Sequence, residues 1–297
     1  MNIAVSMNSK YISAARGMLF SLRGHSREPI TVWLLNHSLS DTDIRKFEAF
    51  LRKKCHAELV VIPIDATFFD GMPLGPEGLF SIEAYYRILI PWLLPPEMDR
   101  VLWLDSDIII CGDISSFYHM DLNGHCLAAC EDERYISAKT RGRDNDRLGI
   151  DRSHRYFNSG VLLMDLERIR KNYNQEDIRI LAERIKDRLV FPDQDILNCL
   201  FQKNVFYADY LLFNCEAKSM KYLAEEQKSN VRILHYYGGN KPWDLRYGYD
   251  PGMRYWNTQI RISGLYALPY AIFFLRTRVN RVAWLRKVYF FLTGRKK

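Results

Sequence analysis

The sequence predicts an α/β protein, a Rossmann-like sandwich in which helices cover both faces of a mostly parallel sheet. Short apolar runs typical of buried strands alternate along the chain with amphipathic stretches typical of helices. The composition, with 48% hydrophobic and 26% charged residues, is that of a globular chain rather than a disordered one. A length of 297 residues is enough to bury a sizeable core in one large domain or two small ones.

The predicted strands are short runs of aliphatic and β-branched residues, several of them apolar at every position. Such runs fit a sheet that is buried on both of its faces. The strands are expected at Ile3–Met7, Ile30–Leu35, Leu59–Ile64, Val101–Ile110, Leu127–Cys130, Gly160–Met164 and Val231–Leu234.

The predicted helices lie between these strands. Ser40 suits the N-cap position of the second helix, and Asp43 stands where its capping partner belongs. The third helix is expected to end before Pro91, and Arg134–Tyr156 reads as a long polar loop. The helices are expected at Ile12–Leu22, Ser40–Lys53, Ser81–Ile90, Leu166–Leu189 and Asp193–Gln202.

Two carboxylates interrupt the apolar stretch VLWLDSDIIICGDI. Asp105 and Asp107 are two residues apart, so on extended backbone they point the same way and repel each other. A purely structural interpretation is a pair of solvated acids that cap a turn. A functional one is a divalent cation between them, because carboxylates are ligands of Mn²⁺ and Mg²⁺.

A histidine follows the last predicted strand, in the stretch ILHYYGGNKPW. His235 is a candidate third ligand, although a histidine in this position is more often a structural hydrogen-bonding group. Gly238 lets the backbone approach a ligand closely, and Lys241 suits an anionic phosphate. Imidazole with carboxylates favours Mn²⁺ over Mg²⁺, with Mg²⁺ as the alternative.

The net charge of +7 is concentrated at one end of the chain. Residues 251–297 hold ten basic residues and no acid, so the remainder carries 32 basic against 35 acidic residues. This distribution argues against a nucleic-acid-binding body and for a surface contact made by the tail. Six cysteines without a C-x-x-C pair, and no signal-peptide pattern, indicate a reducing, cytosolic environment.

Six ordered motifs over about residues 1–250 resemble glycosyltransferase family 8, which includes glycogenin and bacterial lipooligosaccharide α-galactosyltransferases. The motifs are NxxY at Asn8–Tyr11, YYRILI with Arg87, LWLDSDIIICGDI, YFNSGVLLMDL with Asn158, PDQDILN with Asp193 and Gln194, and HYYGGNKPW. The resemblance implies a GT-A fold and a retaining transfer of glucose or galactose from a UDP-sugar. It also implies that Asp105, Asp107 and His235 hold Mn²⁺ at the donor's diphosphate.

The resemblance assigns further roles by position. Asn8 and Tyr11 are expected at uracil, and Gly238 and Lys241 at the diphosphate. Gln194 is expected near the anomeric carbon, where a neutral amide is a poor nucleophile, so same-face attack is favoured over a covalent intermediate. Asp193 is expected at sugar hydroxyls. Donor phosphate or sugar contacts are expected from Arg87, Ser106, Asp132, Asn158 and Ser159.

Two domains are expected: a catalytic domain at residues 1–250, and a basic aromatic tail at residues 251–297 that anchors to an anionic membrane surface. The alternative for the tail is a helix packed on the catalytic domain. No uncharged apolar run reaches the roughly 18 to 20 residues needed to span a bilayer. We therefore expect a peripheral protein on the cytoplasmic face of the plasma membrane, acting on a surface glycan or glycolipid. The functional alternatives are a weakly catalytic UDP-sugar-binding adaptor and a D-x-D phosphohydrolase.

Overall fold

The computed structural model of the protein describes residues 1–75, 80–136, 138–239, 241–243 and 252–264. Ten strands form two sheets within these ranges. They are β1 (Asn2–Ser6), β2 (Ile30–Asn36), β3 (Ala57–Pro63), β4 (Arg100–Leu104), β5 (Ile108–Ile110), β6 (Leu127–Glu131), β7 (Phe157–Asp165), β8 (Val205–Ala208), β9 (Cys215–Glu216) and β10 (Ile233–His235).

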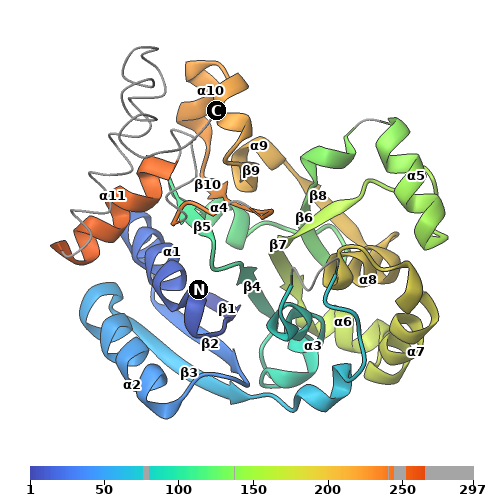
Figure 1. Ribbon diagram of the computed structural model, residues 1–297, viewed down its shortest axis with the longest axis horizontal. Coiled ribbons are helices and arrows are strands. Elements are labelled where there is room, and N and C mark those ends of the chain that lie inside the picture. The colour runs from blue at the N-terminus through green and yellow to red at the C-terminus, as the bar shows by residue number, and fades with distance from the viewer. Residues whose placement is uncertain (76–79, 137, 240, 244–251, 265–297) are drawn as a thin grey trace, which may run out of the picture.

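The large sheet has seven strands in the order β3-β2-β1-β4-β7-β6-β8 (Figure 1). Its neighbouring strands are parallel except for the two pairs that β7 makes with β4 and β6, so the predicted mostly parallel sheet is confirmed. The small sheet has the order β5-β10-β9.

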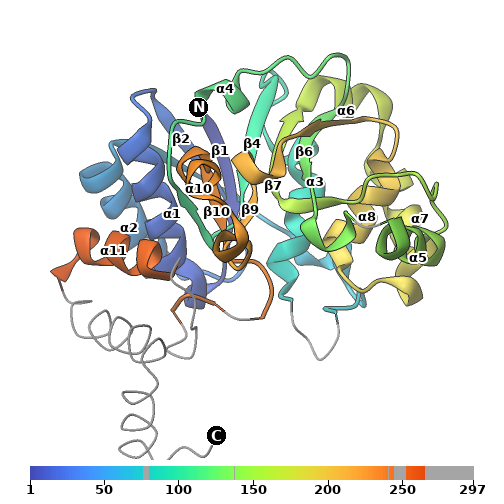
Figure 2. The same cartoon turned by 90° about the horizontal axis from the view of Figure 1, so that it is seen from above.

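Helices cover both faces of the large sheet. The α-helices of the described ranges are α1 (Ile12–His25), α2 (Asp41–Phe50), α3 (Tyr86–Leu93), α4 (Ser115–Tyr118), α5 (Ala138–Leu148), α6 (Leu166–Asn172), α7 (Gln175–Ile185), α8 (Pro192–Phe201), α9 (Tyr210–Phe213), α10 (Glu225–Asn230) and α11 (Gly252–Ile262). Figure 2 shows α1 and α2 on one face of the sheet, and α3 and α8 on the other. No helix in the described ranges is both long and apolar enough to cross a membrane.

Each central strand sends side chains into two separate cores. In β4, Val101 and Trp103 pack with the helices of one face, whereas Leu102 and Leu104 pack with α1 and α2. This two-sided burial explains why the strand is apolar at every interior position, as expected for a sheet covered on both faces.

The strand directions gather several loops at one edge of the large sheet. β1, β4 and β6 end at this edge, and the antiparallel β7 begins there, since Leu104 lies opposite Val161 and Cys130 lies opposite Asn158. The chain segments that follow β1, β4 and β6 therefore lie beside the first residues of β7. Ligands of α/β folds bind at this kind of edge.

The stretch Val101–Ile110 is not the single strand that the sequence predicted. It divides into β4 and β5, which belong to different sheets, and a turn that contains Ser106 and Asp107 separates them. The break follows from the carboxylates themselves, because two adjacent acids are stabilised where the chain leaves the sheet rather than within it.

Three expectations for the helices are also corrected. Pro91 lies inside α3, close enough to its end that only the hydrogen bond to the Arg87 carbonyl is lost. The helix expected over Leu166–Leu189 breaks into α6 and α7, because the Asn174 side chain accepts a hydrogen bond from the Asp177 amide and starts a new helix. The expected loop Arg134–Tyr156 contains α5, whose buried residues are mainly polar and therefore give no apolar period.

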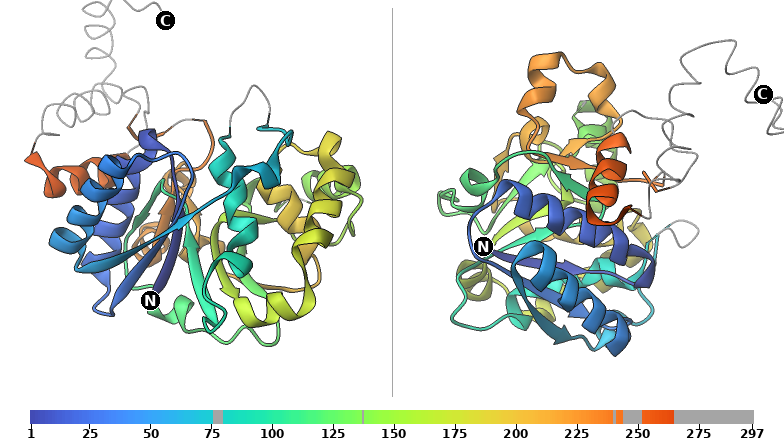
Figure 3. Two further views of the ribbon diagram at one scale, coloured as in Figure 1. Left: turned by 90° about the horizontal axis from the view of Figure 1, so that it is seen from below. Right: turned by 90° about the vertical axis from the view of Figure 1, so that its left-hand side faces the viewer.

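The last described helix, α11, falls in the segment expected to be a separate tail. It packs against α1, and its Tyr255 and Trp256 are buried with residues of the small sheet. The right-hand view of Figure 3 shows α11 lying alongside α1. The packed body of the protein thus continues to Ile262, and residues 265–297 of the expected tail lie outside the described ranges.

Candidate active site

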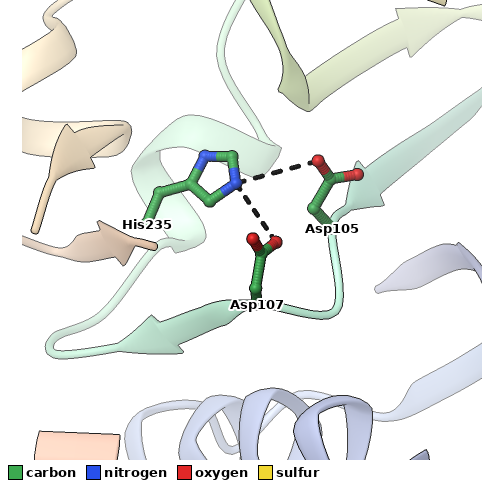
Figure 4. A group of neighbouring side chains, drawn as sticks. All are labelled: Asp105, Asp107 and His235. Carbon is green, nitrogen blue, oxygen red and sulfur yellow. Dashed lines mark ion pairs between the residues drawn. The ribbon is translucent and has the colours of Figure 1, made fainter. Parts of the chain in front are cut away.

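Asp105, Asp107 and His235 converge at the edge where β4 ends (Figure 4). The Nε2 atom of His235 lies 3.3 Å from Asp107 Oδ1 and 3.7 Å from Asp105 Oδ2. The strand pairing accounts for this approach, because His235 at the end of β10 lies opposite Ile108 at the start of β5. One atom from each residue lies within 4.8 Å of the others, a spacing that suits a metal ion.

Hydrogen bonds anchored on the backbone fix the tautomer of His235. The amide of Gly160 donates to Asn158 Oδ1, so this oxygen also accepts from Asn214 Nδ2. The amide oxygen of Asn214 then faces His235 Nδ1 at 2.8 Å and accepts its proton. In the neutral imidazole the lone pair is therefore on the other ring nitrogen, Nε2.

Nε2 of His235 is buried, and no residue in the described part of the chain donates a hydrogen bond to it. It faces two carboxylates, and an arrangement of acceptors alone is unfavourable until a proton or a metal cation completes it. A neutral imidazole and two carboxylates are the donor set of a divalent transition-metal site. The residues present therefore fit a metal cofactor.

The room for this histidine comes from Gly160. A Cβ atom built there would lie 2.2 Å from His235 Cε1 and 2.8 Å from Asp105 Oδ2. The same glycine accepts a hydrogen bond of 2.9 Å from the Asp105 amide through its carbonyl oxygen. A side chain at position 160 would displace two members of the metal-binding group at once.

Lys241 is the cation nearest to this group. Its ammonium donates to Asp107 Oδ2 and, at 3.1 Å, to the carbonyl oxygen of Tyr236. Burial by itself raises the pKa of Asp107, but the charge of the Lys241 ammonium is the largest influence in the opposite direction, and the pKa lies below its ordinary value. Asp107 is therefore a carboxylate, the form that binds metal.

Arg87 connects the metal-binding group to the start of α8. This guanidinium is only 6% exposed, and it pairs with Asp105 at 2.9 Å and with Asp193 at 3.2 Å. It also bonds Ser159 and lies over the ring of Trp103, 4.6 Å from its centroid. Arg87 is thus a buried hub rather than a surface charge on a helix.

Asp193 and Gln194 open α8 and point toward the first residues of β7. Asp193 accepts from the Ser159 hydroxyl at 2.8 Å, and Gln194 Oε1 accepts from the Ser159 amide at 3.1 Å. Burial raises the pKa of Asp193 above its ordinary value, although Arg87 and Ser159 act in the opposite direction. The contacts with Ser159 hold both side chains in one orientation.

Asp132 follows the end of β6 and is completely buried. It accepts from Gln194 Nε2 at 3.2 Å and from Asn158 Nδ2 at 3.4 Å, and it pairs with Arg134. Burial raises the pKa of Asp132, but the bonds from Arg134 more than compensate and keep it below its ordinary value. The guanidinium of Arg134 stacks on Phe191, 4.5 Å from the ring centroid.

The remaining residues singled out in the sequence lie around the same edge. Asn8 caps the turn that precedes α1, and Tyr11 makes an edge-to-face contact with Trp243, with centroids 5.4 Å apart. Ser106 Oγ is buried and has no hydrogen-bond partner among the residues that the structure describes. Gly238 has a φ of +88°, a backbone conformation that favours glycine.

A family model described as glycosyl transferase family 8 matches residues 2–246. The chain belongs to this family. It is 29% identical over 275 residues to lipopolysaccharide 1,2-glucosyltransferase of Escherichia coli (strain K12), a match that covers 89% of this chain and 78% of the relative. It is 25% identical over 249 residues to glycosyltransferase GlyF of Streptococcus pneumoniae serotype 4, which covers 82% of this chain and 57% of the relative.

A solved structure of the galactosyltransferase LgtC, in complex with donor and acceptor sugar analogues, superimposes with a TM-score of 0.77. The sequences are 24% identical, and the match covers 89% of this chain and 96% of LgtC. This likeness confirms the expected GT-A fold. Membership of glycosyl transferase family 8 also leaves no support for the phosphohydrolase alternative.

Asp195, the carboxylate next to Gln194 in this family 8 protein, is fully engaged elsewhere. It accepts hydrogen bonds from Tyr156, from the amides of Val190 and Phe191, and from Arg147 at 3.0 Å. This carboxylate is completely buried and stabilises the turn into α8. It lacks the open approach that a nucleophile requires.

Sequence reasoning missed three residues that shape the site. Gly160 had a detectable signal, because a glycine inside an apolar strand often marks a close approach. Asn214 and Arg134 had none: Asn214 lies outside every motif, and Arg134 stood in a stretch predicted to be a solvated loop. The partners of Asn214 and the Phe191 ring under Arg134 come from distant parts of the chain, and the pairing of Arg134 with nearby Asp132 depends on a turn that the polar pattern does not predict.

Proposed function

We propose that the protein is a retaining, Mn²⁺-dependent hexosyltransferase that transfers glucose or galactose from a UDP-sugar to a surface glycan. The observation that carries the proposal is the unpartnered Nε2 of His235, aimed at Asp105 and Asp107 beside the buried side chains of Asp193 and Gln194. Membership of glycosyl transferase family 8 supports the reaction class.

In this proposal Asp105, Asp107 and His235 hold Mn²⁺. The bound metal would supply positive charge that stabilises the diphosphate as a leaving group. Mn²⁺ is proposed over Mg²⁺ because an imidazole is one of the three ligands. Lys241 would move its ammonium from Asp107 toward the diphosphate and stabilise charge that develops there.

The donor's other groups would be bound by residues of the same sheet edge. Tyr11 and Asn8 would contact uracil, and the Gly238 backbone would approach the diphosphate. Arg87 and Asp193 would contact the sugar, since the hydroxyls of a hexose suit a buried carboxylate and guanidinium. Further donor contacts are proposed for Ser106, Asp132, Asn158 and Ser159.

Same-face attack is the proposed chemical step. The acceptor's hydroxyl oxygen forms a bond to the anomeric carbon while the bond from that carbon to the UDP phosphate oxygen breaks. The acceptor's proton passes to the departing phosphate oxygen. Gln194 steadies the positive anomeric centre with its amide oxygen, because Asp132 and Ser159 hold that amide in place.

The acceptor is proposed to be lipopolysaccharide, lipooligosaccharide, capsule or a glycolipid. The names of two relatives support this acceptor class: the lipopolysaccharide 1,2-glucosyltransferase of Escherichia coli and the lipopolysaccharide 1,3-galactosyltransferase of Salmonella typhimurium. The chain is 24% identical to the Salmonella protein over 258 residues. An anionic membrane surface is proposed as the place of contact for the basic C-terminal segment.

The proposal is tested by turnover of UDP-glucose and UDP-galactose with Mn²⁺, with Mg²⁺ and in EDTA. Asp107→Asn should lower kcat/KM by about 100-fold or more, because a metal supplies several kcal/mol of charge stabilisation. Asp113→Asn is the matched control, since Asp113 caps Ser115 on the surface of the same stretch. Turnover in EDTA equal to turnover in Mn²⁺ would show that the metal assignment is wrong.

A further inference from the structure

α11 has a buried face that meets the small sheet and the residues after it. Tyr255 and Trp256 are 4% and 5% exposed, and they pack in one cluster with Cys215 and Tyr236. Tyr236 immediately follows His235. The helix therefore lies directly behind the segment that carries the histidine and the lysine of the site.

One set of contacts joins α11 to the segment 241–243. The indole Nε1 of Trp256 donates to the carbonyl oxygen of Pro242 at 2.9 Å. The rings of Tyr255 and Trp243 lie 5.5 Å apart. Pro242 and Trp243 follow Lys241 directly, so these contacts fix the backbone from which the lysine extends.

A second set joins α11 to the start of α1. The amide of Gln259 donates to the Ser13 carbonyl oxygen at 2.9 Å, and the Ser13 hydroxyl donates back to Gln259 Oε1 at 3.3 Å. Gln259 is only 1% exposed, and buried amides satisfied at both ends hold one orientation. Gly17 provides the room, because a Cβ atom there would lie 2.8 Å from Gln259 Nε2.

The two sets of contacts meet at the ring pair of Tyr11 and Trp243. Tyr11 lies two residues before Ser13, and Trp243 lies two residues after Lys241; their rings are in edge-to-face contact at 5.4 Å. α11 thus holds both sides of the place where the proposed nucleotide end of the donor would bind. A ring pair held from both sides is preorganised for a planar base.

We propose that α11 is a positioning element for a nucleoside diphosphate, with Trp256 and Gln259 as its positioning residues. This inference rests on the proposed function, since the donor is taken to be a UDP-sugar. It assigns to the first part of the basic C-terminal segment a role in donor affinity. Gln194 takes part in none of the contacts named above, so the contacts of Gln259 should act on donor affinity, whereas those of Trp256 should also act on turnover through Lys241.

Gly17→Ala is the sharpest variant. Alanine has a higher helix propensity than glycine, so the substitution should not weaken α1 itself. The clash falls on the far end of the Gln259 side chain, whose amide nitrogen also donates to Ser13, so the shift that relieves the clash should weaken that hydrogen bond. Gly24→Ala is the matched control in the same helix, because a Cβ atom there would meet no described residue within 4 Å beyond the chain neighbours and the backbone of α1 itself. Trp256→Phe and Gln259→Leu remove the two hydrogen-bonding groups individually.

The readouts are the Kd of UDP with Mn²⁺ from calorimetry, and kcat and KM with the UDP-sugar. Gly17→Ala and Gln259→Leu should raise the Kd and the KM about tenfold and leave kcat within about twofold, whereas Trp256→Phe should raise the Kd and the KM about tenfold and also lower kcat through Lys241. Gly24→Ala should change none of these. If the three variants bind UDP as tightly as Gly24→Ala does, the inference is overturned while the proposed function stands.

Amide hydrogen exchange of the metal-free protein gives a readout that needs no donor. Trp256→Phe should exchange faster in peptides spanning residues 236–243, and Gly17→Ala and Gln259→Leu in peptides spanning residues 8–16, whereas exchange in α7 should not change. If the wild-type protein binds no UDP, the proposed donor is wrong and the donor role of α11 fails with it. Exchange rates equal to those of the wild type, at 236–243 in Trp256→Phe and at 8–16 in the other two variants, overturn the positioning role whatever the donor is.

Discussion

His235 and Asn214 share a hydrogen bond of 2.8 Å between Nδ1 of the imidazole and Oδ1 of the amide. This bond decides which ring nitrogen faces Asp105 and Asp107. Because Asn158 and the Gly160 amide fix the orientation of Asn214, the tautomer is set by the backbone of β7 rather than by the histidine's own strand.

Asn214→Ala should weaken Mn²⁺ binding by about 10- to 100-fold, because partners that orient a ligating histidine have effects of this size. Mn²⁺ affinity can be measured by calorimetry, and independently as the rise in melting temperature that saturating Mn²⁺ produces. Asn172→Ala serves as the control, because Asn172 is exposed at the end of α6, where it bonds the Arg168 carbonyl rather than a residue of the metal-binding group. Equal Mn²⁺ affinity in Asn214→Ala and wild type would contradict this role.

Gly160→Ala should abolish Mn²⁺ binding, because the added methyl would lie 2.2 Å from His235 Cε1. The substitution should also lower the melting temperature, since a buried ring and the Asp105 carboxylate must both move. Gly142→Ala in α5 is the control, with its nearest contact at 3.9 Å. A variant that still binds Mn²⁺ with wild-type affinity would show that His235 is not a ligand.

The product should keep the α configuration of the donor, and no glycosyl adduct should accumulate on the protein. The physical reason is that Gln194 is an amide and therefore a poor nucleophile, while the Asp195 carboxylate already accepts hydrogen bonds from four residues. NMR of the product at early times and mass spectrometry of acid-quenched enzyme test this. A β-linked product, or a covalent adduct that Asp195→Asn removes, would contradict it.

Arg134→Met should lower the free energy of unfolding at pH 7 by about 1–3 kcal/mol. The effect should not be larger, because the Arg134 side chain is 35% exposed and solvent screens its pairing with Asp132. The pKa of Asp132 is held below its ordinary value, so its contribution to stability is present above pH 3.8 and is lost as the pH falls through that lowered pKa. Without Arg134, burial should raise this pKa, and the difference between variant and wild type should shrink in acid.

Urea unfolding between pH 7 and pH 3.5 measures this difference. Arg143→Met is the control, since Arg143 is 76% exposed in its pair with Asp144 and should have little effect. A difference that does not change with pH would mean that Arg134 acts through its stacking on Phe191 instead of through Asp132.

A variant truncated after Gly264 should bind anionic vesicles far less than the full-length chain does. The cut removes eight of the ten basic residues and keeps α11. Each Lys or Arg near an anionic surface contributes about 1 kcal/mol, so binding by the full chain should also weaken as salt rises. Vesicle sedimentation measures binding, and unchanged UDP-sugar hydrolysis shows that the body is intact. Equal sedimentation of both forms would reject the membrane contact.

Much of the scaffold follows from local sequence. The apolar runs predicted β1, β2 and β3, and Ser40 accepts the Asp43 amide as its capping position indicated. Burial on both faces of the sheet produces these runs, so their pattern can be read without knowing the partners. The ordered motifs likewise predicted family membership, because a family preserves residue types at fixed places along the chain.

Tertiary structure alone decided how the site is assembled. The tautomer of His235 depends on Asn158 and Asn214, which are distant from it in sequence, and the space for its ring depends on Gly160. The break between β4 and β5 depends on two sheets that the local pattern cannot distinguish. α11 shows the same principle: its basic and aromatic composition predicts a surface segment, yet Trp256 and Gln259 are buried because α1 and Pro242 offer them partners. Local preference determines an element, whereas contacts between distant residues determine where that element lies.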